Sequence, residues 1–167
     1  MGLREYLEEV ERRSPDQLLR IDQEVDPRYE ITAAVTLLEQ RRQSPILWFT
    51  KVKGSRFPVV VNVTGSKTRV ASTLGVSSRE LVREYLSRSD QLTPFIEIET
   101  SPVKEVVLCG EEADLLKFPQ ITHHANDGGP YITSGIALVR DPETGKYNAS
   151  YNRLMMKGPR KLGICIT

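Results

Sequence analysis

The spacing of apolar residues predicts three helices in the first part of the chain. Apolar residues recur at helical spacing over the first dozen positions, which indicates an amphipathic helix ending near Arg13. A second helix, capped by Asp26 and the proline after it, is expected to end before Ser44. Residues 77–80 (SSRE) form a capping box that opens a third helix. The inner face of this third helix is predicted to carry Leu81, Val82, Tyr85 and Leu86.

Strand patterns lie between these helices. Residues 18–25 alternate apolar and polar side chains, which predicts a strand with one buried face. The β-branched and aromatic runs at residues 46–49 and 59–63 predict two buried strands separated by a turn. Because helices and strands alternate, residues 1–100 are expected to form an α/β layer.

After about Thr100 strands dominate the pattern. One strand and a short helix are predicted at residues 103–108 and 111–117. Further strands are expected at residues 132–140, 146–151, 154–156 and 162–166. The turn sequence DPETG at residues 141–145 joins two of them as a hairpin, which predicts an antiparallel meander. The predicted fold class is therefore α+β, with an α/β layer over residues 1–100 and the start of a β domain over 101–167.

The last predicted strand of the meander has an open edge. It runs to Thr167 with no later strand to pair with it. Unpaired backbone groups on such an edge favour pairing with another strand. We therefore expect the meander to be completed by further chain or by another molecule, and a homo-oligomer is the expected assembly.

Composition excludes several classes of function. The 23 Lys and Arg residues balance 22 Asp and Glu residues, so no basic field favours nucleic acid. Cys109 and Cys165 lie far apart in apolar runs without a Cys/His cluster, which argues against zinc. The charged, helical start is unlike a signal peptide and no apolar run reaches membrane-spanning length. The expectation is a cytoplasmic protein with reduced cysteines and no membrane partner.

Three segments have residue types that suit chemistry, and each also has an ordinary structural explanation. Residues 123–133 (HHANDGGPYIT) gather two histidines, a carboxylate and paired glycines, although a plain loop explains them as well. Residues 148–153 (NASYNR) are dense in hydrogen-bonding groups, as a polar strand edge would be. Residues 65–69 (GSKTR) lack the spacing of a phosphate loop, so a helix start with solvated basic residues is preferred.

The same segments, together with PVVVNVTGSKTRVASTLG and EEADLLKFPQITHHANDGGPYIT, resemble the successive landmarks of the UbiD family of decarboxylases. The resemblance covers essentially the whole chain. It implies a split β-barrel flavin domain and reversible decarboxylation of aromatic or α,β-unsaturated carboxylic acids. It also implies a prenylated FMN supplied by a flavin prenyltransferase, with Mn²⁺ on the flavin phosphate and K⁺ nearby.

The resemblance assigns roles to individual residues. Asn148 resembles the family's metal ligand, and its amide oxygen is a donor that manganese accepts. Arg153 resembles the catalytic arginine beside the flavin, whose planar fork suits a substrate carboxylate and an acidic partner. The expected cofactor contacts are Thr133, Asn148, Ser150, Tyr151, Asn152 and Arg153. Residues 123–133 contain the loop that is one of the family landmarks, called the landmark loop below. A structural role is expected for its residues His123, His124 and Asp127.

Two departures from the family pattern leave a second hypothesis open. Position 152 is Asn where the family commonly has Tyr or a small residue. The remaining metal ligands and the glutamates of the proton relay are expected beyond Thr167, so this segment alone is expected to be inactive. The alternative is a non-catalytic subunit that binds a flavin, a nucleotide or a partner, which the sequence downstream of Thr167 would distinguish.

Overall fold

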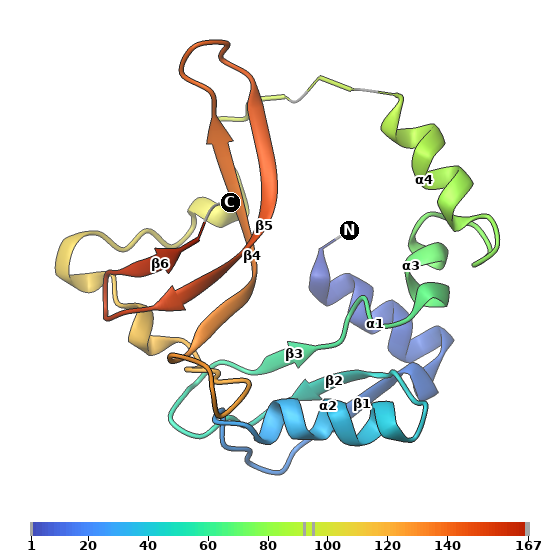
Figure 1. The fold of residues 1–167 in the computed structure, drawn as a ribbon, viewed down its shortest axis with the longest axis horizontal. Coiled ribbons are helices and arrows are strands. Elements are labelled where there is room, and N and C mark those ends of the chain that lie inside the picture. The colour runs from blue at the N-terminus through green and yellow to red at the C-terminus, as the bar shows by residue number, and fades with distance from the viewer. Residues whose placement is uncertain (1, 92, 95, 166–167) are drawn as a thin grey trace.

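The computed structural model describes residues 2–91, 93–94 and 96–165, which form two small sheets with helices around the first (Figure 1). This arrangement confirms the α+β class. The long hairpin of the second sheet and the last α-helix project from opposite ends of the first layer.

The first sheet contains β1 (Leu18–Ile21), β2 (Ile46–Phe49) and β3 (Val59–Val61). β1 pairs parallel to β2, and β2 pairs antiparallel to β3. Side chains of a strand alternate between its two faces, so β2 serves two cores. Leu47 and Phe49 pack with Ile31 of α2 (Glu30–Gln40), whereas Ile46 packs with Leu7 of α1 (Leu3–Arg13). The two helices therefore cover opposite faces of the sheet.

The second sheet contains β4 (Tyr131–Arg140), β5 (Tyr147–Met156) and β6 (Leu162–Ile164) in antiparallel order. The predicted hairpin and meander are thus confirmed. Gly145 takes a φ of 70° in the turn, a conformation that glycine adopts without strain. β5 is longer than expected because it continues without a break from Tyr147 through Met156.

The predicted strand at residues 103–108 and helix at 111–117 are wrong. The structure has short 3₁₀ helices at η2 (Pro102–Lys104), η3 (Gly110–Glu112) and η4 (Leu115–Lys117), after η1 (Pro15–Gln17) near the start of the chain. Val103, Val106 and Val107 are exposed, so the apolar run has no described neighbour to bury it as a strand. Propensity without a packing partner does not make a strand.

Three predicted boundaries in the first layer are also inaccurate, and one of them is the strand expected over residues 59–63, which ends at Val61. The strand expected over residues 18–25 ends at Ile21, and Val25 keeps only an isolated bridge to Val52. The second helix begins at Glu30, because Asp26 accepts a hydrogen bond from the Arg28 N–H and so forms a turn before the helix.

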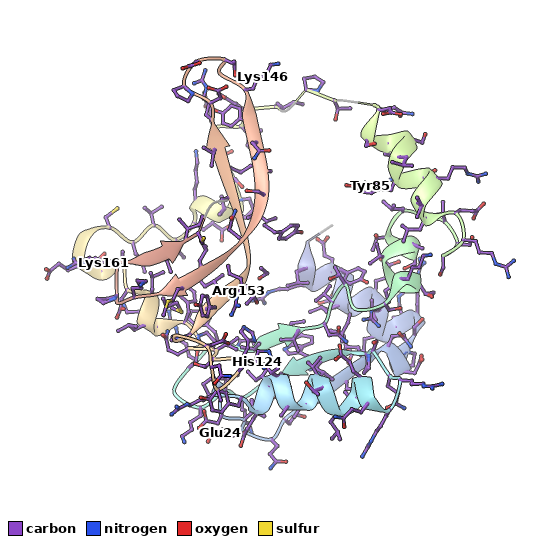
Figure 2. All side chains as sticks on the ribbon, viewed as in Figure 1. Glu24, Tyr85, His124, Lys146, Arg153 and Lys161 are labelled. Atoms are coloured by element: carbon purple, nitrogen blue, oxygen red, sulfur yellow. The ribbon has the colours of Figure 1, made fainter. Side chains whose placement is uncertain are left out.

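The short helix α3 (Lys67–Thr73) and the helix α4 (Leu81–Ser89) correct two expectations about side-chain burial. Val82, Tyr85 and Leu86 of α4 are exposed among the described residues, and Tyr85 projects away from the helix (Figure 2). Their predicted inner face is therefore wrong for this part of the molecule. Arg69 of α3 was expected to be solvated but is buried.

The segment at residues 118–123 joins the two sheets. The Tyr29 N–H donates to the Thr122 carbonyl at 2.9 Å, and the Thr122 N–H donates to the Pro27 carbonyl at 3.2 Å. Phe118 stacks on Phe57 with ring centroids 5.1 Å apart. The landmark loop that follows is therefore fixed against the first layer. None of the helices in the described ranges has the length and apolar content needed to span a bilayer.

Candidate active site

Arg153 lies at the base of the β4–β5 hairpin, where the hairpin approaches the first layer (Figure 2). Its Nη2 donates to Asp127 Oδ1 at 3.1 Å, and its guanidinium carbon lies 4.1 Å from the centre of the Tyr131 ring. An ion pair and a stacked ring together restrain the planar group. Because the side chain is still 53% exposed, it can meet a ligand while keeping these partners.

The Asp127 carboxylate connects Arg153 to the landmark loop. Its second oxygen accepts a hydrogen bond from the His124 N–H at 3.0 Å, and only 13% of the side chain is exposed. Burial alone would raise the pKa of Asp127, but the hydrogen bonds from Arg153 and the His124 N–H outweigh it and lower this pKa. Asp127 is therefore an anion that fixes the position of Arg153 near neutral pH.

The glycine pair after Asp127 permits a close approach to β5. A Cβ atom on Gly128 would lie 3.0 Å from Met155 Cε, and one on Gly129 would lie 3.3 Å from it. Gly129 also has a φ of 155°, which side chains with a Cβ rarely adopt. The DGG sequence therefore brings Asp127 within reach of Arg153, two residues before Met155 along β5.

His123 anchors the same loop to α2. Its Nδ1 lies 3.2 Å from the Thr32 hydroxyl, whereas its buried Nε2 has no hydrogen-bond partner in the described ranges. Burial lowers the pKa of His123, and the nearby Asp127 carboxylate only partly offsets this. The imidazole is therefore neutral at pH 7.

The start of α2, which carries Thr32, is constrained as well. Its N-cap residue Tyr29 takes a φ of 75°, which a bulky residue seldom adopts.

A β-bulge lies opposite Arg153. Ile132 pairs with Leu154 and Gly135 with Asn152, so Thr133 and its neighbour face the single residue Arg153. Bulges increase local twist and re-aim side chains, and they are frequent next to active sites. The structure thus brings Thr133 to the same level of the sheet as Arg153.

The remaining predicted residues occupy both faces of β5. Every second side chain of a strand lies on the same face, so Asn148, Ser150 and Asn152 share one face of β5. On this face Asn152 Nδ2 donates to Ser150 Oγ at 2.9 Å. Tyr151 and Arg153 belong to the opposite face. The sheet itself therefore separates Asn148 from Arg153.

The exposed edge of β5 offers one place from which both faces can be reached. In the part of the chain that the structure describes, β6 pairs only with Leu154 to Met156. The outer edge of β5 from Tyr147 to Arg153 therefore presents backbone groups to whatever lies beside it. A ligand along this edge could contact the backbone and reach side chains of both faces.

Asn148 is the residue here that suits a hard metal ion. Its amide oxygen is a suitable donor for manganese. Within the described ranges, no cluster of three or more His, Cys, Asp or Glu residues could complete such a site. A metal bound at Asn148 would therefore have to take its other ligands from outside the described residues or from the cofactor.

Sequence reasoning missed the immediate partners of Arg153. It expected acidic partners later in the chain and gave Asp127 only a structural role, and it did not consider Tyr131. The signal was present, because an Asp-Gly-Gly loop directly precedes the strand that pairs with the arginine strand. Hairpin register would have placed these residues together.

Comparison with known families matches nearly the whole chain in two consecutive parts. Residues 11–89 match the 3-octaprenyl-4-hydroxybenzoate carboxy-lyase N-terminal domain. Residues 96–167 match the Rift-related domain of the same carboxy-lyase.

Individual relatives are longer than this chain. An anhydromevalonate phosphate decarboxylase of Methanosarcina mazei is 36% identical over 149 residues, which are 87% of this chain and 32% of the relative. The solved UbiD-class enzyme HmfF of Pelotomaculum thermopropionicum, an evolved dimeric form in complex with prFMN, superimposes with a TM-score of 0.88 at 36% identity. That match covers 99% of this chain and 38% of HmfF. This chain therefore spans about a third of the length of these relatives.

A more distant structure shares the fold alone. The apo 3,4-dihydroxybenzoic acid decarboxylase of Klebsiella pneumoniae gives a TM-score of 0.89 at 23% identity, over 99% of this chain and 36% of that protein.

Proposed function

Because this chain belongs to the UbiD family of carboxy-lyases, we propose that it is the flavin-side part of a decarboxylase that uses prenylated FMN. The observation that carries the proposal is the restrained arginine at the base of the hairpin. Arg153 is held by Asp127 and Tyr131 and remains half exposed beside an open strand edge. The likeness to a structure that contains prFMN supports the choice of cofactor.

Arg153 is proposed to bind the carboxylate of the substrate. A guanidinium fork matches a carboxylate with two parallel hydrogen bonds, and its permanent charge persists at all working pH values. Asp127 would restrict the guanidinium to one orientation before substrate arrives, so that little conformational freedom is lost on binding. Since arginine cannot donate its proton to the product, an acid outside these residues must do so.

The edge of β5 fits a flat, phosphate-bearing cofactor. Gly135 and Ala137 lie opposite Asn152 and Ser150, so the polar row on this face has small neighbours. We assign Thr133, Ser150, Tyr151 and Asn152 to contacts with the flavin. Asn148 would hold Mn²⁺ at the flavin phosphate, with K⁺ nearby. When bound, the prenylated flavin supplies the electron sink that decarboxylation requires.

The proposal extends to partners, setting and domain organisation. The substrate class is aromatic or α,β-unsaturated carboxylic acids, a flavin prenyltransferase supplies the cofactor, and the protein forms a homo-oligomer. A relative named as a decarboxylase supports a carboxylic acid substrate, and a relative solved in an evolved dimeric form supports the homo-oligomer. A cytoplasmic setting agrees with the free thiols of Cys109 and Cys165. We place the boundary between the two domains at about residue 100.

Replacing Asn148 tests the cofactor assignment in the complete protein. Asn148→Ala should reduce manganese and flavin retention together, because its amide oxygen would hold the metal proposed at the flavin phosphate. The loss should exceed the roughly 10–100-fold effect of removing a residue that only orients a metal ligand. Metal content and flavin absorbance of purified protein measure it, with Asn126→Ala in the exposed loop as control. Wild-type amounts of both in Asn148→Ala would exclude this residue from the site.

A further inference from the structure

A cavity lies among α1, α3 and α4, elements that contribute nothing to the Arg153 site. Figure 1 shows these helices grouped on the side of the molecule opposite the hairpin. The cavity has a volume of about 540 Å³, within the roughly 300–1,000 Å³ typical of small-molecule sites. Its apolar lining comes from Val10, Leu74 and the ring of Tyr6. Its hydroxyl groups come from Thr68 and Ser72.

Arg69 lines this cavity and is 5% exposed. Its Nη1 donates to Gln17 Oε1 at 2.9 Å, its Nη2 to the Asn62 carbonyl at 2.8 Å and its Nε to the Val63 carbonyl at 3.4 Å. All three acceptors are neutral. A guanidinium has five N–H groups, so two of them, one on each Nη, have no acceptor among the described residues.

The other arginines of the cavity already have counter-ions. Arg13 pairs with Glu9 at 3.0 Å, and Arg88 pairs with Glu84 at 2.8 Å. Arg69 has no such pairing in the described ranges, and burial lowers its pKa. Buried charges are normally paired, because removing a charge from water is unfavourable. The cavity therefore has an excess of positive charge at its most buried side chain.

We propose that this cavity binds a small organic carboxylate, which pairs with Arg69 and lays its apolar part against Val10 and Leu74. A carboxylate has two acceptor oxygens for the two N–H groups that Arg69 leaves unused. The apolar wall favours an organic anion over inorganic phosphate. The site is separate from the proposed flavin site, so it does not depend on the decarboxylase assignment.

Benzoate is a suitable probe, titrated calorimetrically into flavin-free complete protein that carries Arg153→Gln, so that the β5 site does not contribute. We expect binding that Arg69→Gln abolishes. Because Arg69 also joins α3 to its neighbours, Ser72→Glu provides a second test at an exposed position on the cavity wall. The new carboxylate should weaken benzoate binding about tenfold or more, which corresponds to about 1.4 kcal/mol.

The control is Ser87→Glu, the same change at an exposed position of α4 outside the cavity lining, which should bind benzoate like the parent. The inference is overturned if benzyl alcohol binds as tightly as benzoate, or if Ser72→Glu leaves benzoate affinity unchanged. Inorganic phosphate binding more tightly than benzoate would refute the organic-carboxylate class. None of these results affects flavin retention, which separately tests the proposed function.

Discussion

Two residues of the landmark loop have different charge states near neutral pH. His123 is neutral because burial disfavours its charged form, and Asp127 is anionic because Arg153 and a backbone N–H stabilise its charge. Both pKa values are lowered relative to the unfolded chain. In each case the unfolded state binds protons at a higher pH than the folded state, so stability falls as the solution becomes acidic.

His123 should make the protein less stable as pH falls below about 6.5, the usual histidine pKa. The folded state resists protonation of this ring while the unfolded state accepts the proton, so the free energy of unfolding decreases with falling pH. Urea unfolding between pH 7.5 and 5 measures the slope. His123→Asn should flatten it, whereas His124→Asn, which changes the only other histidine of the chain, should retain it. Equal slopes in both variants would contradict the assignment.

Asp127 should act in a more acidic range. Its contribution is complete above about pH 3.9, the usual aspartate pKa, and is lost as pH falls through the lower folded-state pKa. Asp127→Asn should therefore destabilise the protein at pH 7, and the difference from wild type should shrink toward pH 2. Asp16→Asn, at an exposed position in η1, is the matched control. A difference that does not change with pH would show that the carboxylate charge is not involved.

At the scale of elements, stability resides in the first layer rather than in α4. Phe49 is 1% exposed in the core of the first sheet, whereas Leu86 on α4 is 56% exposed. Phe49→Ala in the 167-residue chain should lower the free energy of unfolding by about 3–5 kcal/mol. Leu86→Ala should change it by less than about 0.5 kcal/mol. Denaturant unfolding measures both, and a large effect of Leu86→Ala would indicate that α4 is buried in solution.

Periodicity predicted the elements that bury a face and failed where the apolar residues have no partner. The runs at Ile46–Phe49 and Val59–Val61 form strands because α1 and α2 cover them. The segment at 103–108 (VKEVVL) also has three valines and a leucine, but all four remain exposed. The pattern reports which side chains can be buried, and only the surrounding elements decide whether they are.

Resemblance proposes the residues of the candidate site but does not give their geometry. It points to Arg153 and Asn148, and strand alternation places them on opposite faces of β5. The Asp127 partner required knowledge of the hairpin register and of the bulge at Thr133. Such contacts join positions far apart in sequence, which local patterns do not encode.

For the whole molecule, we propose that this chain supplies one side of an active site. Arg153 lies at the base of a hairpin whose outer edge is open, and the relatives are about three times as long. A single amide ligand binds a divalent ion weakly compared with a site that adds imidazole and carboxylate. We therefore expect the 167-residue chain alone to release no carbon dioxide from any acid, even with prenylated FMN and Mn²⁺ supplied.

The decisive measurement is carbon dioxide release by the complete, flavin-loaded protein across a panel of aromatic and acrylic acids. We expect turnover of at least one acid. Arg153→Lys should retain flavin but lose activity about a hundredfold, because an ammonium cannot reproduce the two-point geometry of the guanidinium. Unchanged turnover in Arg153→Lys would refute the proposed role of Arg153. Turnover by the 167-residue chain alone would refute the proposal that this chain supplies only one side of the site.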